Sequence, residues 1–294
     1  MRAFLTGATG WIGSAVAYEL LAAGHSVVGL VRSKEDGEKL AAGVMPLLGS
    51  LADLDVLWQG AAKADGVIHT AFGLNFSDYD KLSQEDRAAI ETFGLVYAGS
   101  NRPIVVTSGL GTLPAGETFT EDARPAVIPE YPRASEQTAF ALAERGIRAC
   151  AVRPARSVHG LGERHGFVPQ LAEIARKTGV SAYAGDGQNP WPAVHRLDAA
   201  RVFRLFVERG AAGEAYHAVA ESVPFRSVAE AIGRQVGVPS KSTTAEEAQV
   251  HFSGLAIWVT GSGPVSSEKT RAVLGWEPME IGMIADIDRA EYFG

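Results

Sequence analysis

The chain has 294 residues, of which 46% are hydrophobic and 21% charged, and its formal net charge is −7. These values are typical of an ordinary globular protein with one large domain or two moderate ones. The negative charge gives no reason to expect nucleic acid or an anionic membrane as a partner, and no apolar run approaches the roughly 20 residues of a membrane span.

Cysteine usage and the N-terminus indicate the compartment. The single cysteine, Cys150, lies in an apolar segment that predicts a strand, so we expect it to serve packing rather than to act as a reactive thiol. The first predicted strand begins at the N-terminus, so we expect no signal peptide before it. A reducing, cytoplasmic location fits both observations.

The first 24 residues predict a strand, a glycine turn and a helix. Apolar residues 3–5 are followed by Gly7, Gly10 and Gly13, and a helical pattern then continues to Gly24. Gly7 permits a tight turn, Gly10 lets the backbone approach phosphates, and Gly13 lets the helix pack close to the strand. The free N–H groups at the helix start face an anion in such a motif. We therefore expect the pyrophosphate of a dinucleotide here.

The end of the second predicted strand, residues 26–31, indicates which dinucleotide binds. In a dinucleotide fold this strand end faces the adenosine ribose, where a carboxylate would bind the 2′-hydroxyl. Arg32 stands there instead, and its planar fork of donors suits a 2′-phosphate. The sequence therefore favours NADP(H), with NAD(H) as the alternative.

Strands and helices alternate regularly up to residue 153. Helices are expected at 34–42, 55–61, 79–99 and 134–145, and strands at 44–48, 66–71, 103–108 and 147–153. This alternation predicts an α/β fold with a doubly wound parallel sheet. Because ligands of such sheets bind beyond the carboxyl ends of the strands, one crevice should hold the residues at those ends. They are Gly7, Arg32, Ser50, Ala71, Ser108 and Pro154.

The rest of the chain alternates less regularly and predicts a smaller lobe. We expect loops at 156–166 and 183–192, helices at 167–177 and 227–237, an amphipathic helix after Asp198, and a strand at 215–220. The dinucleotide domain is accordingly placed at residues 1–160, with 193–220 returning to it. Residues 161–192 and 221–294 are expected to form a substrate-binding lobe that closes over the crevice.

An ordered set of motifs resembles the short-chain dehydrogenase/reductases in their extended or atypical branch. The set consists of TGATGWIG (6–13), VIHTA (67–71), VVTSG (105–109), RPARSVHG (153–160), VHRLDAA (194–200) and SSEKTRAVLGWEP (266–278). The resemblance covers nearly the whole chain. It implies a Rossmann domain of about seven strands, a small C-terminal lobe, and hydride chemistry at C4 of a nicotinamide.

The resemblance also assigns cofactor contacts to matching positions. It implies that the glycine turn holds the pyrophosphate, that Arg32 holds the 2′-phosphate, and that Ser50 with the Leu51 backbone replaces the family's Gly-Asp near the adenine. Further contacts are implied for Thr9, Trp11 and Ile12 at the pyrophosphate, for Ala71 and Phe72 at the ribose, and for the turn from Pro154 to Val158 at the nicotinamide.

The catalytic pattern of the family is a Tyr-x-x-x-Lys pair with a serine or threonine at the end of the fifth strand. A tyrosine, with a pKa of about 10, is a poor acid–base near neutral pH unless a nearby cation lowers that pKa. Ser108 stands at the serine position and Tyr131 is the candidate tyrosine, but Ser135 stands where lysine is expected. The alternative register places Pro132 in the tyrosine position and Glu136 in the lysine position.

Three interpretations of the proton donor stay open. Tyr131 acts with help from Arg133 or from the charge of the cofactor, or another group such as Tyr79, His159 or His165 donates, or the chain binds NADP(H) without turnover. His159 lies in a polar, glycine-spaced loop at the position of the family's substrate loop, and such loops often carry function.

The leading functional hypothesis is an NADPH-dependent oxidoreductase that reduces a small carbonyl compound or oxidises the corresponding alcohol. The alternatives are a nucleotide-sugar epimerase or dehydratase and a non-catalytic NADP(H)-sensing module. No Cys or His spacing predicts a metal site. By analogy with the family, the helices expected at 79–99 and 134–146 would pair in a homodimer.

Overall fold

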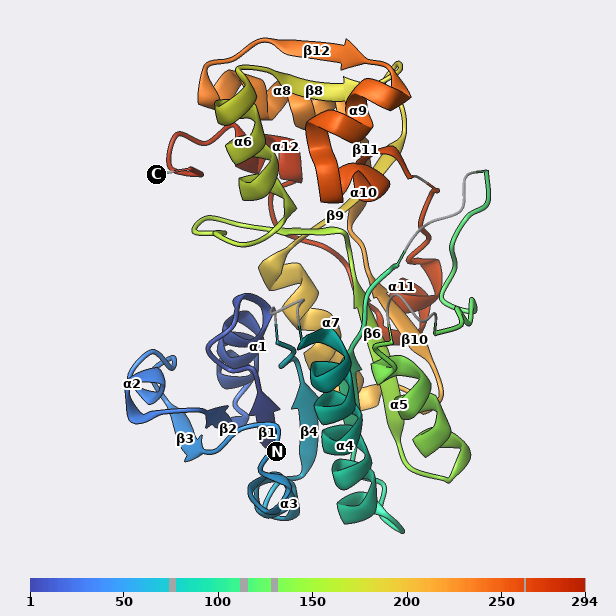
Figure 1. The fold of residues 1–294 in the computed structure, drawn as a ribbon. Coiled ribbons are helices and arrows are strands. Elements are labelled where there is room, and N and C mark those ends of the chain that lie inside the picture. The colour runs from blue at the N-terminus through green and yellow to red at the C-terminus, as the bar shows by residue number, and fades with distance from the viewer. Residues whose placement is uncertain (74–77, 112–115, 128–131, 262, 294) are drawn as a thin grey trace.

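The computed structural model describes residues 1–73, 78–111, 116–127, 132–261 and 263–293. Within these ranges a parallel sheet of seven strands forms the centre of the larger half, in the order β10-β6-β5-β4-β1-β2-β3 (Figure 1). Its strands are β1 (Arg2–Thr6), β2 (Ser26–Val31), β3 (Val44–Leu48), β4 (Gly66–His69), β5 (Ile104–Thr107), β6 (Ala149–Pro154) and β10 (Ala215–Ala218). The expected doubly wound α/β class is confirmed.

Helices cover both faces of this sheet because its strands direct apolar side chains to both sides. Ala3 and Leu5 pack with α1 (Trp11–Ala22) and α7 (Arg196–Arg209), whereas Phe4 points to the opposite face. That opposite face is covered by α3 (Leu54–Ala62), α4 (Tyr79–Tyr97) and α5 (Ser135–Glu144). The strand order reverses beside β1, which is where such a sheet opens a crevice for ligands.

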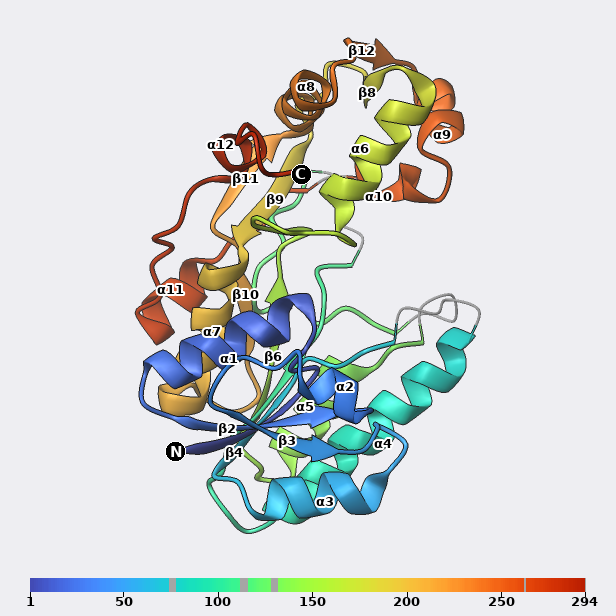
Figure 2. The same ribbon diagram turned by 90° about the vertical axis from the view of Figure 1, so that its left-hand side faces the viewer.

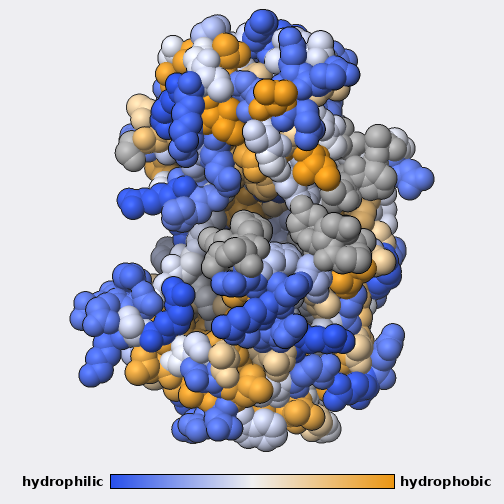
Figure 3. All heavy atoms as spheres, viewed as in Figure 1, coloured by the Kyte–Doolittle hydropathy of each residue, from blue (hydrophilic) through white to orange (hydrophobic). Residues whose placement is uncertain are grey.

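A second apolar core forms the C-terminal lobe, above the carboxyl ends of the strands (Figure 2). Its elements are α6 (Phe167–Thr178), β8 (Ser181–Ala184), α8 (Phe225–Val236), β12 (Ser240–Thr243), α9 (Ala245–Phe252), the 3-10 turn Ser253–Leu255, α10 (Ala256–Thr260) and α12 (Met283–Ile287). A three-stranded sheet joins the two halves: β7 (Ser157–His159), β9 (Pro190–His195) and β11 (Glu221–Pro224). Figure 3 shows a recess between the halves.

Three segments differ from the expectations. The helix expected at 34–42 is reduced to α2 (Lys34–Gly37), because glycine is about 1 kcal/mol less favourable than alanine inside a helix. The loops expected at 156–166 and 183–192 contain β7, the end of β8, and β9. Their strands are held by distant partners, β9 lying between β11 and β7, so local periodicity carries no signal for them.

Two further features bear on the expected organisation. The last helix of the SSEKTRAVLGWEP motif, α11 (Glu268–Leu274), packs against α7 and β10, while α4 and α5 lie side by side. The homodimer expected through α4 and α5 stays a prediction.

Among the described helices, none combines the length and the apolar character that a membrane span requires. Cys150 is buried in the sheet, and burial raises the pKa of its thiol.

Candidate active site

The glycine turn after β1 is shaped by backbone contacts that leave no room for side chains. Gly7 has a φ of 72°, and a Cβ on Gly13 would lie 2.0 Å from the Gly7 carbonyl oxygen. The Gly10 N–H donates to that same oxygen at 2.9 Å. Helix α1 then begins at Trp11 without a side-chain cap. The turn therefore presents first-turn N–H groups in the arrangement that attracts anions.

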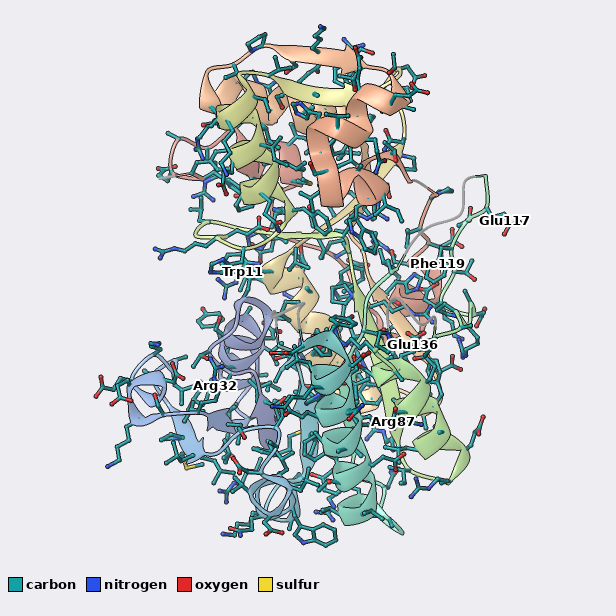
Figure 4. All side chains as sticks on the ribbon, in the orientation of Figure 1. Trp11, Arg32, Arg87, Glu117, Phe119 and Glu136 are labelled. Atoms are coloured by element: carbon teal, nitrogen blue, oxygen red, sulfur yellow. The ribbon has the colours of Figure 1, made fainter. Side chains whose placement is uncertain are left out.

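An arginine that sequence reasoning missed lies beside this turn. The Arg196 guanidinium stacks 3.9 Å from the centre of the Trp11 ring and donates from Nη2 to Ser14 Oγ at 2.7 Å. Its Nε is buried and has no hydrogen-bond acceptor among the described residues. Burial lowers the pKa of Arg196. Trp11, labelled in Figure 4, donates in turn from Nε1 to the Val158 carbonyl at 2.6 Å, which ties the turn to β7.

An exposed cation follows β2, at the position predicted to face the adenosine ribose. The Arg32 side chain is 84% exposed, and its Nε lies 3.9 Å from Asp36 in α2. After β3, the Ser50 N–H and hydroxyl both donate to the Asp53 carboxylate at 2.8 Å, and these bonds lower the pKa of Asp53. Sequence reasoning did not single out Asp53, because the acidic residue of the family directly follows the glycine, whereas Asp53 stands three residues after Ser50.

The predicted cofactor residues, except Val158, follow the carboxyl ends of the strands of the seven-stranded sheet, and Val158 lies in β7 of the three-stranded sheet. By strand, the others are Gly7, Thr9, Gly10, Trp11, Ile12 and Gly13 after β1, Arg32 after β2, Ser50 and Leu51 after β3, Ala71 and Phe72 after β4, and Pro154 at the end of β6. Their contacts with a cofactor stay predictions. The positive-φ turn and the unpartnered Nε of Arg196 fit an anionic dinucleotide laid across this edge.

A second arginine, Arg133, lies where β4 and β5 end. Its Nη2 donates to the Thr107 carbonyl at 2.6 Å and its Nε to Ser135 Oγ at 2.8 Å. Its guanidinium lies 4.0 Å from the centre of the Phe72 ring, and that ring contacts Tyr79 edge-on at 5.5 Å. Burial lowers the pKa of Arg133, although Asp86 and Tyr79 act in the opposite direction. These contacts fix a cation at the ends of β4 and β5, against Phe72, which was predicted to line the ribose.

A buried carboxylate, Asp86 of α4, organises the groups behind Arg133. Ser135 Oγ donates to Asp86 Oδ2 at 2.7 Å, and His69 Nε2 lies 3.0 Å from Asp86 Oδ1. Burial alone would raise the pKa of Asp86, but the hydrogen bond and charge of His69, followed by Arg133 and Ser135, outweigh burial and lower it. An ionised carboxylate only accepts, so Nε2 of His69 donates.

The contacts around Asp86 continue toward the glycine turn. Nδ1 of His69 lies 2.7 Å from Thr6 Oγ1, which accepts from the Ala71 N–H at 3.3 Å. One chain of bonds thus runs from the strand before the glycine turn to Arg133. Sequence reasoning missed Asp86, because α4 follows β4 in the chain and nothing local marks one helix position as facing the sheet edge.

The residues of the expected Tyr-x-x-x-Lys pair are placed as follows. Tyr131 lies outside the described residues, and Ser108 is half-buried at the end of β5. Ser135 bridges Arg133 and Asp86, as described above. Glu136, labelled in Figure 4, forms a buried two-point ion pair with Arg153, with N–O distances of 2.6 and 2.9 Å. In the second register, the lysine position is therefore occupied by the Glu136 carboxylate, which is already paired with Arg153.

The candidate His159 lies away from solvent. It is 1% exposed, its Nδ1 lies 2.8 Å from Asp286 of α12, and its ring contacts His195 edge-on at 5.4 Å. His165 is exposed. Within the described ranges, no group of three or more His, Cys, Asp or Glu side chains could hold a metal ion.

A buried glutamate lies near this histidine. Glu163 Oε2 accepts from the Tyr292 hydroxyl at 2.6 Å, which fastens the C-terminal segment to the loop after β7. Burial raises the pKa of Glu163 to about 7, with a further contribution from Asp286 and opposition from the Tyr292 hydrogen bond.

Comparisons with known proteins agree with this geometry. Residues 7–181 match the family described as NAD(P)H-binding. The chain is 44% identical over 296 residues to the uncharacterized protein C2A9.02 of Schizosaccharomyces pombe, with 100% of both chains covered. It is 29% identical over 262 residues to the 2-alkyl-3-oxoalkanoate reductase of Stenotrophomonas maltophilia, covering 81% of this chain and 77% of that protein.

A solved structure shares the whole fold. UDP-glucose 4-epimerase from Thermotoga maritima, determined with UDP-glucose, superimposes with a TM-score of 0.77 over 100% of this chain and 98% of that one, at 18% identity. The crevice, the glycine turn and the sequence matches lead to one conclusion. The chain belongs to the NAD(P)H-binding family, and its fold and ordered motifs resemble those of the extended short-chain dehydrogenase/reductases.

Proposed function

We propose that the protein is an NADPH-dependent reductase that converts a small carbonyl compound to the corresponding alcohol. The observation that carries this proposal is Arg133, a cation fixed by Thr107 and Ser135 at the carboxyl ends of two central strands. Negative charge develops on the carbonyl oxygen during reduction, and donors already held in place stabilise it without reorganisation. The ketone substrate in the name of the Stenotrophomonas relative supports the same chemistry.

The cofactor is assigned to the carboxyl edge of the sheet. The N–H groups of the glycine turn and Arg196 would hold the pyrophosphate, and Arg32 would hold the 2′-phosphate that distinguishes NADPH. The exposure of Arg32 supports this role, because a guanidinium that is free to move can close on a phosphate. A bound nicotinamide supplies the hydride.

The carbonyl oxygen is assigned to Ser108, Tyr131 and Arg133. Ser108 would hold the oxygen by a hydrogen bond, and Tyr131 would give it a proton. Arg133 follows Tyr131 by two residues, and a cation nearby favours the phenolate and so lowers the pKa of a tyrosine. In this scheme Arg133 replaces the lysine of the family, and Asp86 holds it through Ser135.

Tyr79 is the second candidate donor, because its ring lies against Phe72, and the Arg133 guanidinium stacks on that same Phe72 ring. We assign His159 a structural role instead. Its Nδ1 is held by a buried carboxylate and its ring by His195, so it fastens α12 to β7.

The test is NADPH oxidation, followed by absorbance, against a panel of ketones and aldehydes. Tyr131→Phe should lower kcat by roughly 10²- to 10⁴-fold, as expected for loss of a general acid, while NADPH binding by nicotinamide fluorescence stays unchanged. The same loss in Tyr79→Phe, with Tyr131→Phe active, would transfer the role to Tyr79. Bound NADPH without turnover of any compound would contradict the reductase and favour the sensor. NAD copurified with the protein would favour the epimerase alternative.

A further inference from the structure

Arg156 lies in the turn between β6 and β7. Its guanidinium lies between two indole rings, 5.1 Å from the centre of Trp191 in β9 and 5.6 Å from that of Trp258 in α10. Its Nη1 donates to the carbonyls of Trp258 at 2.8 Å and Gly261 at 3.1 Å. Backbone and aromatic contacts therefore fix the head group.

The charge of Arg156 has no balancing anion within the described part of the chain. Its Nη2 is buried and has no hydrogen-bond acceptor there, and no described carboxylate forms an ion pair with it. Burial lowers the pKa of Arg156 to about 10, so the group stays charged near neutral pH. Arg153, three residues earlier, differs: its guanidinium has a two-point partner in Glu136. A buried, unpaired cation is costly to keep unless something outside the chain pairs with it.

The place of Arg156 connects it to the reacting end of the crevice. Pro154 ends β6, which lies beside β5 in the sheet, and the Val158 carbonyl two residues after Arg156 accepts from Trp11. On the other side, Trp258 belongs to α10, the lobe helix that Figures 1 and 2 both show facing the sheet domain. Arg156 thus stands between the strand ends and the lobe.

We propose that Arg156 binds a carboxylate of the substrate, so that the enzyme reduces oxo acids in preference to neutral ketones. This inference rests on the proposed function. The planar guanidinium fork matches a carboxylate, and the partly exposed Trp258 ring offers an apolar wall to the carbon chain of the acid. One cation balances the single charge of a carboxylate, whereas a phosphate ester carries up to two. The fixed head group selects the anion without first having to be ordered.

The test compares an acid with its ester in variants of the full-length protein. The probes are 3-oxohexanoate and methyl 3-oxohexanoate, with NADPH saturating. Wild type should prefer the acid, and Arg156→Met should lower kcat/KM for the acid by roughly 10- to 100-fold, mainly through KM, because a hydrogen bond to a charged group is lost. In the same variant, kcat/KM for the ester should change less than about threefold. Arg156→Lys should fall between the two, since it keeps the charge without the fork.

A matched control removes another arginine that stacks on an aromatic ring of the same lobe. Arg226 lies 5.5 Å from the centre of the Tyr183 ring but is half exposed and paired with Glu230. Arg226→Met should leave the preference for the acid unchanged. Circular dichroism of each variant reports folding. If Arg156→Met fails to fold, Arg156→Lys decides alone, by whether its kcat/KM for the acid falls as predicted or stays unchanged.

Binding of hexanoate, which has no carbonyl to reduce, separates this inference from the proposed function. Calorimetry should show hexanoate binding to wild type and at least tenfold weaker binding to Arg156→Met. That result without turnover of either probe would refute the reductase and keep the anion site. Equal turnover of acid and ester, unchanged in Arg156→Met, would refute the anion site and keep the reductase. Preference for dihydroxyacetone phosphate over both probes would overturn the assignment to a carboxylate.

Discussion

Glu163→Gln should make the folded protein more stable above neutral pH. Glu163 is buried, its Oε2 accepts from the Tyr292 hydroxyl at 2.6 Å, and burial raises its pKa from 4.5 to about 7. Because the folded-state pKa exceeds the unfolded one, the folded state holds an extra proton between about pH 4.5 and 7. The free energy of unfolding therefore falls as pH rises through this window.

The magnitude follows from the difference between these two pKa values. At 1.36 kcal/mol per unit, ionised Glu163 costs the folded state about 3 kcal/mol above pH 7 and nothing below pH 4.5. Glutamine keeps an oxygen that accepts from Tyr292 and cannot ionise. The variant should therefore gain up to about 3 kcal/mol relative to wild type at pH 8 and little at pH 4.5.

The assay is urea unfolding of both proteins at pH 4.5, 6 and 8. The difference between wild type and variant is the measured quantity, because every other ionisable group is common to both proteins. Glu173→Gln, in an exposed pair with Lys177, serves as a control and should stay within about 0.5 kcal/mol at each pH. A difference for Glu163→Gln that does not grow with pH would refute the reasoning.

Three further predictions concern the crevice. Asp86→Asn should release Arg133, because Asp86 holds Arg133 through Ser135, and it should lower kcat by roughly tenfold or more while the affinity for NADPH holds. A pH profile of kcat that stays the same as in wild type would contradict this role of Asp86. Gly13→Ala places a Cβ 2.0 Å from a carbonyl oxygen, so it should destabilise the protein by about 1–3 kcal/mol and weaken NADPH binding in fluorescence titrations. The control Gly254→Ala, whose Cβ would lie in open space, should change neither the stability nor the binding. Arg32→Ala should weaken NADPH binding by roughly tenfold or more and leave NADH binding unchanged; equal losses for both would remove Arg32 from the 2′-phosphate site.

The sheet was predictable because its signals are local. Each strand to β6 is a short apolar run between turns, and the seven-stranded sheet confirms that pattern. β9 was missed because Pro190 and Trp191 become strand residues only by pairing with β11, and residues 193–195 also pair with β7. Such pairing depends on the folded lobe and leaves no periodicity in a segment rich in glycine and proline.

The candidate site was predictable where backbone shape defines it and not where buried charges meet. Gly7 and Gly13 follow from the space that the turn allows. By contrast, Asp86 meets Ser135 across 49 positions of sequence, and Arg196 meets Ser14 across 182. Contacts of that range join side chains whose roles appear only once α4, α5 and α7 are packed on the sheet.

The most direct test of the central claim follows a deuterium atom. NADPH carrying deuterium at both C4 positions is incubated with the protein and a ketone that it consumes, and the alcohol is analysed by mass spectrometry. The proposed reductase should place one deuterium on the carbinol carbon, with the rate lowered in Arg133→Met. An alcohol without deuterium, or NADPH bound while every carbonyl compound is returned unchanged, would contradict it.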